Sequence, residues 1–226
     1  MTRQMSKGQC NLCGDTFSKS AMTRHLKSCK QKEKESEKSS SSRVPRKAEV
    51  FHLVVKGRYA PDYWMHLEVP ADATLEDLDN FLRDIWLECC GHMSAFTIEG
   101  RTYSVAPMAE YDDESMEARL NEILRPGMKF NYEYDFGSTT HLSMKVVSQE
   151  QKQIKDEFIT VLARNEPPSI TCMSCGKMAA QVCTECLWSG EGWLCDECAA
   201  EHKCGEEMLL PVVNSPRVGV CGYTGQ

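Results

Sequence analysis

Residues 50–86 show two apolar patterns typical of strands, followed by one typical of a helix. An apolar run from Val50 to Val55 predicts a buried strand, and strict alternation over residues 63–69 predicts a second. Thr74 is expected to begin a helix, because Asp77 three residues later completes a capping-box pattern. Apolar residues then follow at helical spacing, so one face of this helix should pack on the sheet. They are Leu75, Leu78, Leu82, Ile85 and Trp86.

The residues that follow predict a hairpin, a helix and another strand pair. Residues 95–98 and 102–105 suit a hairpin around Gly100. Spaced apolar residues predict a second amphipathic helix, which should end at Pro126-Gly127. These residues are Met116, Leu120, Ile123 and Leu124.

The last predicted strands complete the fold class. Residues 130–134 and 142–146 alternate on either side of Gly137, which predicts an antiparallel pair. Residues 154–163 are ambiguous, but Ile159-Thr160-Val161 favours a final strand. The expected fold is α+β: a central mixed or antiparallel sheet with two helices, flanked by small zinc-binding modules.

Composition shifts divide the chain into four parts. Residues 31–47 contain no aliphatic or aromatic residue except Val44, so a flexible basic and Ser-rich linker is expected there. Pro167 and Pro168 mark the other boundary. The parts are a finger over 1–30, the linker over 31–47, the α+β domain over 48–166 and a cysteine-rich module with its tail over 167–226.

The net charge of −7 is the sum of a basic N-terminal segment, here called the head, and an acidic remainder, here called the body. Residues 1–49 hold 12 lysines and arginines against 5 acidic residues, a net of +7, whereas the remainder carries 14 against 28, a net of −14. The head is therefore expected to meet a polyanion and the body to repel one.

Four residues near the N-terminus have the spacing of a zinc finger. Cys10 and Cys13 form a knuckle, and His25 and Cys29 lie one helical turn apart, so the four can meet one tetrahedral Zn²⁺. A segment this short depends on the metal for folding.

Contact between the finger and nucleic acid is one of two open interpretations. Arg24 occupies a base-reading position by analogy with DNA-binding fingers, but one finger reads only about three base pairs. Nearby lysines would add phosphate contacts: Lys19, Lys27 and Lys30. The other interpretation is a finger that docks protein.

Eight more ligands occur in four pairs near the C-terminus. In order they are Cys172 and Cys175, Cys183 and Cys186, Cys195 and Cys198, then His202 and Cys204. Eight ligands suit two closed tetrahedral sites. In a cross-brace the first and third pairs share one ion and the second and fourth pairs the other. Cys221 remains an alternative to Cys204, and the expected total is three Zn²⁺ ions.

The order and spacing of these pairs resemble the B-box and MYND class of cross-brace fingers. That resemblance implies a module that docks other proteins. The spacing departs from a RING finger, so no ubiquitin-ligase activity is implied.

The middle of the chain, about residues 48–150, resembles the plasmid pRiA4b ORF-3-like family. The likeness is carried by Tyr63-Trp64-Met65, Val69-Pro70-Ala71-Asp72, Thr74-Leu75-Glu76-Asp77-Leu78, Gly91-His92, Ser94-Ala95-Phe96, Tyr132-Glu133-Tyr134-Asp135-Phe136-Gly137 and His141. The resemblance implies an α+β fold without an established enzymatic activity. The chain departs from the family pattern at Asp79 and over residues 138–140, which puts any polar pocket of the relatives in doubt.

Three functional hypotheses follow. The first is a non-enzymatic zinc adaptor, whose partner is a protein and, through residues 1–47, a nucleic acid. The second is a nucleic-acid-binding regulator associated with mobile elements. The third is an enzyme that uses His92, Asp135 and His141, although local hydrogen bonding accounts for these residues more simply. Cys89 and Cys90 are expected to be ordinary small buried residues.

Cysteine usage and apolar run lengths suggest where the protein works. Thirteen cysteines in ligand spacing favour a reducing compartment, so the expected location is the cytoplasm. No run of about 18 apolar residues is present, which predicts no contact with a membrane. The oligomeric state is not specified by the sequence.

Overall fold

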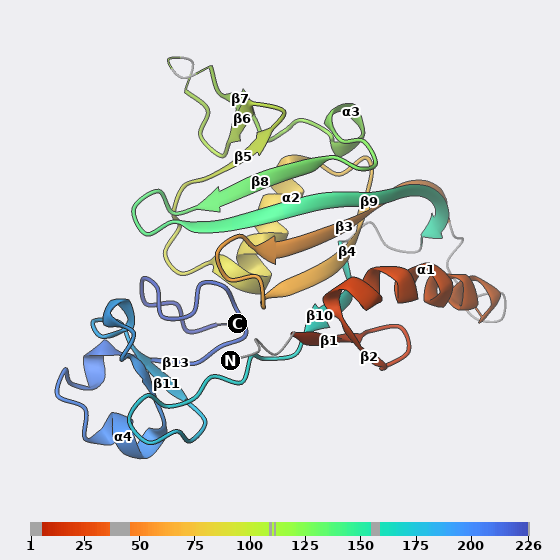
Figure 1. Cartoon of the computed structure of the whole chain (residues 1–226). Coiled ribbons are helices and arrows are strands. Elements are labelled where there is room, and N and C mark those ends of the chain that lie inside the picture. The colour runs from red at the N-terminus through yellow and green to blue at the C-terminus, as the bar shows by residue number, and fades with distance from the viewer. Residues whose placement is uncertain (1–5, 37–45, 109, 111, 155–158, 226) are drawn as a thin grey trace.

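Ten strands form one sheet that takes in both the finger and the central region (Figure 1). The computed structural model describes residues 6–36, 46–108, 110, 112–154 and 159–225. The strand order is β2-β1-β10-β4-β3-β9-β8-β5-β6-β7, and all neighbours are antiparallel except β6 and β7. The strands are β1 (Lys7–Cys10), β2 (Thr16–Ser18), β3 (Arg46–Gly57), β4 (Trp64–Pro70), β5 (Ser94–Ile98), β6 (Arg101–Ser104), β7 (Glu114–Ser115), β8 (Lys129–Tyr134), β9 (Thr140–Ile154) and β10 (Thr160–Asn165).

Few helices accompany this large mixed sheet. They are α1 (Lys19–Ser36), α2 (Leu75–Leu82), the π-turn η2 (Arg83–Leu87), α3 (Leu120–Ile123) and α4 (Asp196–Ala200), with short 3-10 turns η4 (Leu187–Ser189) and η5 (Glu206–Met208). A second sheet of three strands has the order β12 (Trp193–Leu194), β11 (Gln181–Cys183) and β13 (Leu209–Pro211). No helix in the described part of the chain is long and apolar enough to cross a membrane.

Several predicted elements are present with the predicted chemistry. Thr74 caps α2, and its hydroxyl accepts a hydrogen bond from the Asp77 amide while the Asp77 carboxylate accepts one from the Thr74 amide. The hairpin of β5 and β6 turns at Glu99 and Gly100, which both have positive φ. The pair of β8 and β9 is also confirmed, and β10 is the final strand of the ten-stranded sheet.

The predicted second amphipathic helix is wrong in extent, because only Leu120–Ile123 is helical. The preceding residues use their carbonyls to cap the start of α2 instead. The Leu75 amide donates to the Ala118 carbonyl at 3.1 Å, and the Glu76 amide donates to the Met116 carbonyl at 2.9 Å. Met116 and Leu120 are nevertheless buried in the core. Their apolar spacing therefore indicated which residues are buried, but not that they form a helix.

The linker expected over residues 31–47 is also shorter than predicted. Helix α1 continues to Ser36 and β3 begins at Arg46, so both ends of that range belong to regular elements. Residues 37–45 lie outside the described part of the chain.

The finger is joined to the central sheet rather than separate from it. Strand β1 pairs with β10, with Gly8 opposite Asn165 and Cys10 opposite Ala163. A small core of finger residues closes over Trp64 and Leu162. This contact buries Trp64, which lies on the face of β4 that alternation predicted to be polar.

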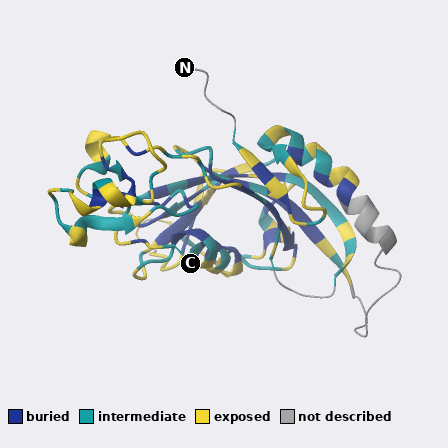
Figure 2. Ribbon diagram, turned by 90° about the horizontal axis from the view of Figure 1, so that it is seen from below, coloured by how far each residue is buried: buried dark blue, intermediate teal, exposed yellow. Residues whose placement is uncertain are grey.

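The main core lies between the sheet and α2 with η2 (Figure 2). Buried residues of β3, β4, β8 and β9 supply the sheet side of this core. Inside it, Asp79 accepts hydrogen bonds from the hydroxyls of Tyr132 at 2.6 Å and Ser94 at 2.7 Å, and it pairs with Arg83 at 2.6 Å. This network fixes η2 and the segment that follows it.

Candidate metal centres and a basic groove

The four predicted finger ligands converge at one point. The ligand atoms of Cys10, Cys13, His25 and Cys29 all lie within 4.8 Å of one another. The Sγ atoms of Cys10 and Cys29 are 4.0 Å apart, and Cys13 Sγ is 3.3 Å from His25 Nε2. With zinc–sulfur bonds of about 2.3 Å and zinc–nitrogen bonds of about 2.0 Å, the edges of a tetrahedral site are roughly 3.5–3.8 Å. The cluster therefore has the size that Zn²⁺ requires.

A knuckle and a helix hold these finger ligands in place. Gly14 has a φ of +80°, and its amide donates to the Cys10 carbonyl at 2.8 Å, which turns the chain between the two cysteines. The ring of Phe17 stacks on His25 with centroids 4.0 Å apart, and Met22 is fully buried. Phe17 and Met22 are thus part of the small core beside the ligands.

The eight C-terminal ligands meet in two clusters with the interleaved pairing. Cys172, Cys175, Cys195 and Cys198 form one, and Cys183, Cys186, His202 and Cys204 form the other. Cys186 Sγ is 3.5 Å from His202 Nε2 and 3.6 Å from Cys204 Sγ. Between the two candidates for the last ligand, the structure brings Cys204 and not Cys221 to this cluster.

Hydrogen bonds from backbone amides lower the pKa of two of these cysteines. Amide hydrogen bonds, chiefly from Cys195 and then from Cys175 and Ser174, lower the pKa of Cys172 to about 6. Burial raises the pKa of Cys183, but amides of Cys186 and Glu185 outweigh it and the net shift is downward.

Other thiols in these clusters, among them Cys29 and Cys186, show the opposite shift. Burial and the neighbouring Cys10 raise the pKa of Cys29 to about 12. A hydrogen bond with Cys204, followed by burial, raises the pKa of Cys186 to about 12. Thiolates packed this closely repel one another, so a bound cation is what makes several of them stable together.

A fourth cluster was missed from the sequence. Cys89, Cys90, His92 and Cys221 also place their ligand atoms within 4.8 Å of one another. Cys89 and Cys90 are therefore not ordinary buried residues, and Cys90 is exposed. The available signal was the pattern Cys-Cys-x-His together with Cys221, which the other clusters do not use.

The three residues of the enzyme hypothesis do not form one site. His92 Nε2 lies 3.6 Å from Asp135 Oδ2, but the Nδ1 atom of His141 is 3.0 Å from Glu133 Oε1. Adjacent residues of a strand point to opposite faces, and Thr140, the neighbour of His141, contacts Arg217, the ion-pair partner of Asp135. His141 is therefore turned toward the other face of the sheet.

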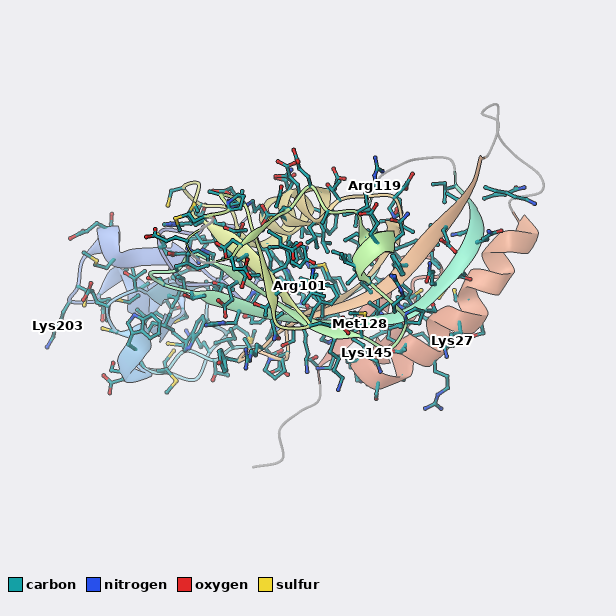
Figure 3. All side chains as sticks on the ribbon, turned by 90° about the horizontal axis from the view of Figure 1, so that it is seen from above. Lys27, Arg101, Arg119, Met128, Lys145 and Lys203 are labelled. Carbon is teal, nitrogen blue, oxygen red and sulfur yellow. The ribbon has the colours of Figure 1, made fainter. Side chains whose placement is uncertain are left out.

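A groove of about 650 Å³ lies between α1 and the face of the sheet opposite α2. Five lysines line it, and no carboxylate is found among its described lining residues. The lysines are Lys19 and Lys27 from α1, Lys56 from β3, Lys129 from β8 and Lys145 from β9. Figure 3 shows Lys27 and Lys145 on the same side of the molecule, with Lys203 at the far end.

Two lysines of the groove face each other directly. Lys129 and Lys145 are cross-strand partners in β8 and β9, and both are exposed. Like charges in such a pair are destabilising unless an anion lies between them. Of the finger residues expected to contact nucleic acid, Lys19 and Lys27 line the groove, whereas Arg24 is exposed outside it and the side chain of Lys30 lies outside the described residues.

Comparisons with known proteins bear on the central sheet. Residues 49–172 match the model of a family described as plasmid pRiA4b ORF-3-like protein. A crystal structure of a protein of unknown function, MM3350 from Methanosarcina mazei Go1, is similar with a TM-score of 0.46 and 17% identity, over 52% of this chain and 70% of that one. No curated protein matches the chain.

Proposed function

The chain belongs to the plasmid pRiA4b ORF-3-like protein family, and from this starting point we propose that it is a non-enzymatic zinc-binding interaction protein. In this proposal the groove between α1 and the sheet binds the phosphate backbone of a nucleic acid. The observation that carries it is five lysines lining one groove of a chain whose net charge is −7. Zn²⁺ in the finger holds the helix that forms one wall.

The electrostatics of the groove favour a polyanion over a single anion. Lys56, Lys145 and Lys129 lie on the neighbouring strands β3, β9 and β8, and α1 on the other side of the groove adds Lys19 and Lys27, so the cations extend across the groove. Asn131 and Ser143 lie between them and add hydrogen-bonding groups. Phosphates at regular spacing along a strand match such a row of cations, and binding releases counterions.

The metal clusters support a structural role rather than catalysis. Each of the three predicted clusters has four protein ligands, which leaves no position for a substrate or a water. We therefore propose three structural Zn²⁺ ions and no enzymatic activity. The thirteen cysteines are all free thiols, which fits a reducing compartment such as the cytoplasm.

A second function is favoured for the C-terminal module. Trp188 is 79% exposed, and Met173 and Met178 are 57% and 60% exposed. Aromatic residues and methionine are enriched where proteins bind one another. We propose that this module docks a protein partner. Crosslinking of the full chain in lysate should yield protein adducts that Trp188→Ala loses, and an unchanged set of adducts would argue against this surface.

The nucleic-acid proposal is tested by the salt dependence of binding. A labelled oligonucleotide of roughly 20 nucleotides, single-stranded and as a duplex, is titrated with the full chain between about 50 and 200 mM salt. We expect affinity to fall with salt. Replacing Lys129 and Lys145 by alanine should flatten the logarithmic slope by roughly 0.7–0.9 per lysine.

The matched control removes a lysine from the opposite end of the molecule. Lys203→Ala lowers the positive charge without touching the groove and should leave the slope unchanged. The proposal would be contradicted if affinity did not depend on salt concentration, or if Lys203→Ala changed the slope as much as the groove substitutions do. The comparison of single strand with duplex identifies which form of backbone fits the groove.

A further inference from the structure

Four ligand atoms outside the predicted sites surround a point between the central domain and the C-terminal tail. His92 Nε2 is 2.9 Å from Cys90 Sγ and 3.2 Å from Cys221 Sγ. Cys90 Sγ is 3.6 Å from Cys89 Sγ and 3.8 Å from Cys221 Sγ. The sulfur–sulfur distances are close to the roughly 3.8 Å edge of a tetrahedral zinc–thiolate site.

We propose that Cys89, Cys90, His92 and Cys221 bind a fourth Zn²⁺, which fastens the C-terminal tail to the family domain. Three thiolates and one imidazole are a tetrahedral zinc donor set. This site does not depend on the groove or on nucleic-acid binding. It differs from the other three because its ligands lie on either side of the C-terminal module in the sequence rather than within one short segment.

The family domain positions the first three ligands. Arg83, held by Asp79, donates to the His92 carbonyl at 2.7 Å. The Glu88 carboxylate accepts a hydrogen bond from the Gly91 amide at 2.5 Å and from the Tyr134 hydroxyl at 3.0 Å. The turn between Cys90 and His92 is thereby fixed, so both side chains reach the same point without a metal having to order the loop.

The tail is held so that Cys221 arrives opposite them. The Ser215 hydroxyl donates to the Trp86 carbonyl at 2.6 Å, and the Trp86 indole donates to the Asn214 carbonyl at 3.1 Å. Tyr223 is buried. These contacts fasten residues 214–223 to the family domain.

The backbone at Cys221 has an unusual conformation. Its φ is +49°, a left-handed conformation that residues other than glycine seldom adopt, and it stands between Gly219 and Gly222, which also have positive φ. Such a conformation persists where the surroundings hold it, and it directs the Cys221 thiol toward Cys90 and His92.

A buried arginine supports the charge of the site. Arg217 is fully buried, and its Nη2 lies 3.4 Å from Cys89 Sγ and 2.8 Å from Asp135 Oδ2. A hydrogen bond from a guanidinium favours the thiolate form that a metal needs. Cys90 and Cys221 are exposed, whereas two ligands of the finger site are buried. Zinc should therefore dissociate from this site more readily than from the finger site.

Native mass spectrometry of the full chain, purified with zinc and a thiol reductant, tests the proposal. We expect four zinc ions in the wild type and three in both Cys221→Ser and Cys90→Ser. As a control, Val220→Ser changes the neighbouring tail residue without removing a ligand and should retain four. Hydrogen exchange should show faster exchange over residues 214–223 in the two cysteine variants.

Three outcomes would count against the site. Three ions in the wild type, or four in either cysteine variant, would overturn it. A disulfide between Cys90 and Cys221, seen as a loss of two hydrogens in reductant, would also overturn it. A variant that fails to fold would lose more than one zinc ion. In that case Co²⁺ titration of the wild type tests the site: a stoichiometry of four ions supports it, and a stoichiometry of three overturns it. Fewer than three ions in the wild type would instead refute the zinc sites of the proposed function.

Discussion

Arg217 and Asp135 form an ion pair that is almost wholly removed from water. Arg217 also donates to the Thr140 hydroxyl at 3.1 Å and the Ser138 carbonyl at 3.2 Å. Asp135 has a φ of +65°, and its Oδ1 accepts from the amides of Gly137 and Ser138, so it caps the turn at these residues. Burial raises the pKa of Asp135, but Arg217 and these amides outweigh it and the net shift is downward.

Arg217→Met should destabilise the protein by about 3–5 kcal/mol, because it leaves the Asp135 carboxylate buried without its cation. Urea unfolding at constant free zinc measures the loss. The matched control is Arg101→Met, which removes an ion pair with Glu114 whose side chains are 70% and 43% exposed. Exposed pairs contribute little, so Arg101→Met should leave the midpoint unchanged. Equal effects of the two substitutions would show that the buried pair is not a special anchor of the tail.

At the scale of elements, local signals were read correctly and contacts between distant segments were not. The cap of α2, the turn at Gly100 and the β8–β9 pair each depend on residues close together in sequence. Helix α3 is short because the carbonyls of Met116 and Ala118, which precede it, accept hydrogen bonds from amides of α2. No local sequence pattern predicts this tertiary contact. The docking of β1 on β10 was equally invisible, since it joins residues about 150 positions apart.

The close approach of β1 to the sheet depends on Gly8. A Cβ atom there would meet the ring of Trp64 and the Arg164 carbonyl. Gly8→Val should therefore separate the finger from β10 at a cost of about 1–3 kcal/mol. Hydrogen exchange over residues 7–10 and 160–165 measures the separation.

Lys7→Val is the matched control for Gly8→Val, because it places the same side chain on the exposed side of the same strand. Unchanged protection in Gly8→Val would mean that the finger does not rely on this contact.

At the scale of the whole molecule, the grouping of twelve candidate metal ligands into three clusters was predictable from spacing, whereas the groove and the fourth cluster were not. Ligands of the three predicted sites lie within short segments, so their spacing reports their geometry. Lys56, Lys129 and Lys145 belong to the body, whose net charge of −14 predicted that it repels phosphate. Only the folded sheet gathers them opposite α1. Cys221 is likewise separated in the sequence from Cys89, Cys90 and His92 by the C-terminal module.

The most direct test of the account is oligonucleotide binding after removal of the finger ligand Cys13. Every groove lysine remains in Cys13→Ser, but α1 loses a ligand of the Zn²⁺ that we propose holds it. We predict that affinity at about 50 mM salt falls at least about tenfold. Cys198→Ser, which removes a ligand from the distant C-terminal cluster, should bind as the wild type does. Equal affinity of Cys13→Ser and the wild type would contradict the claim that zinc builds the groove.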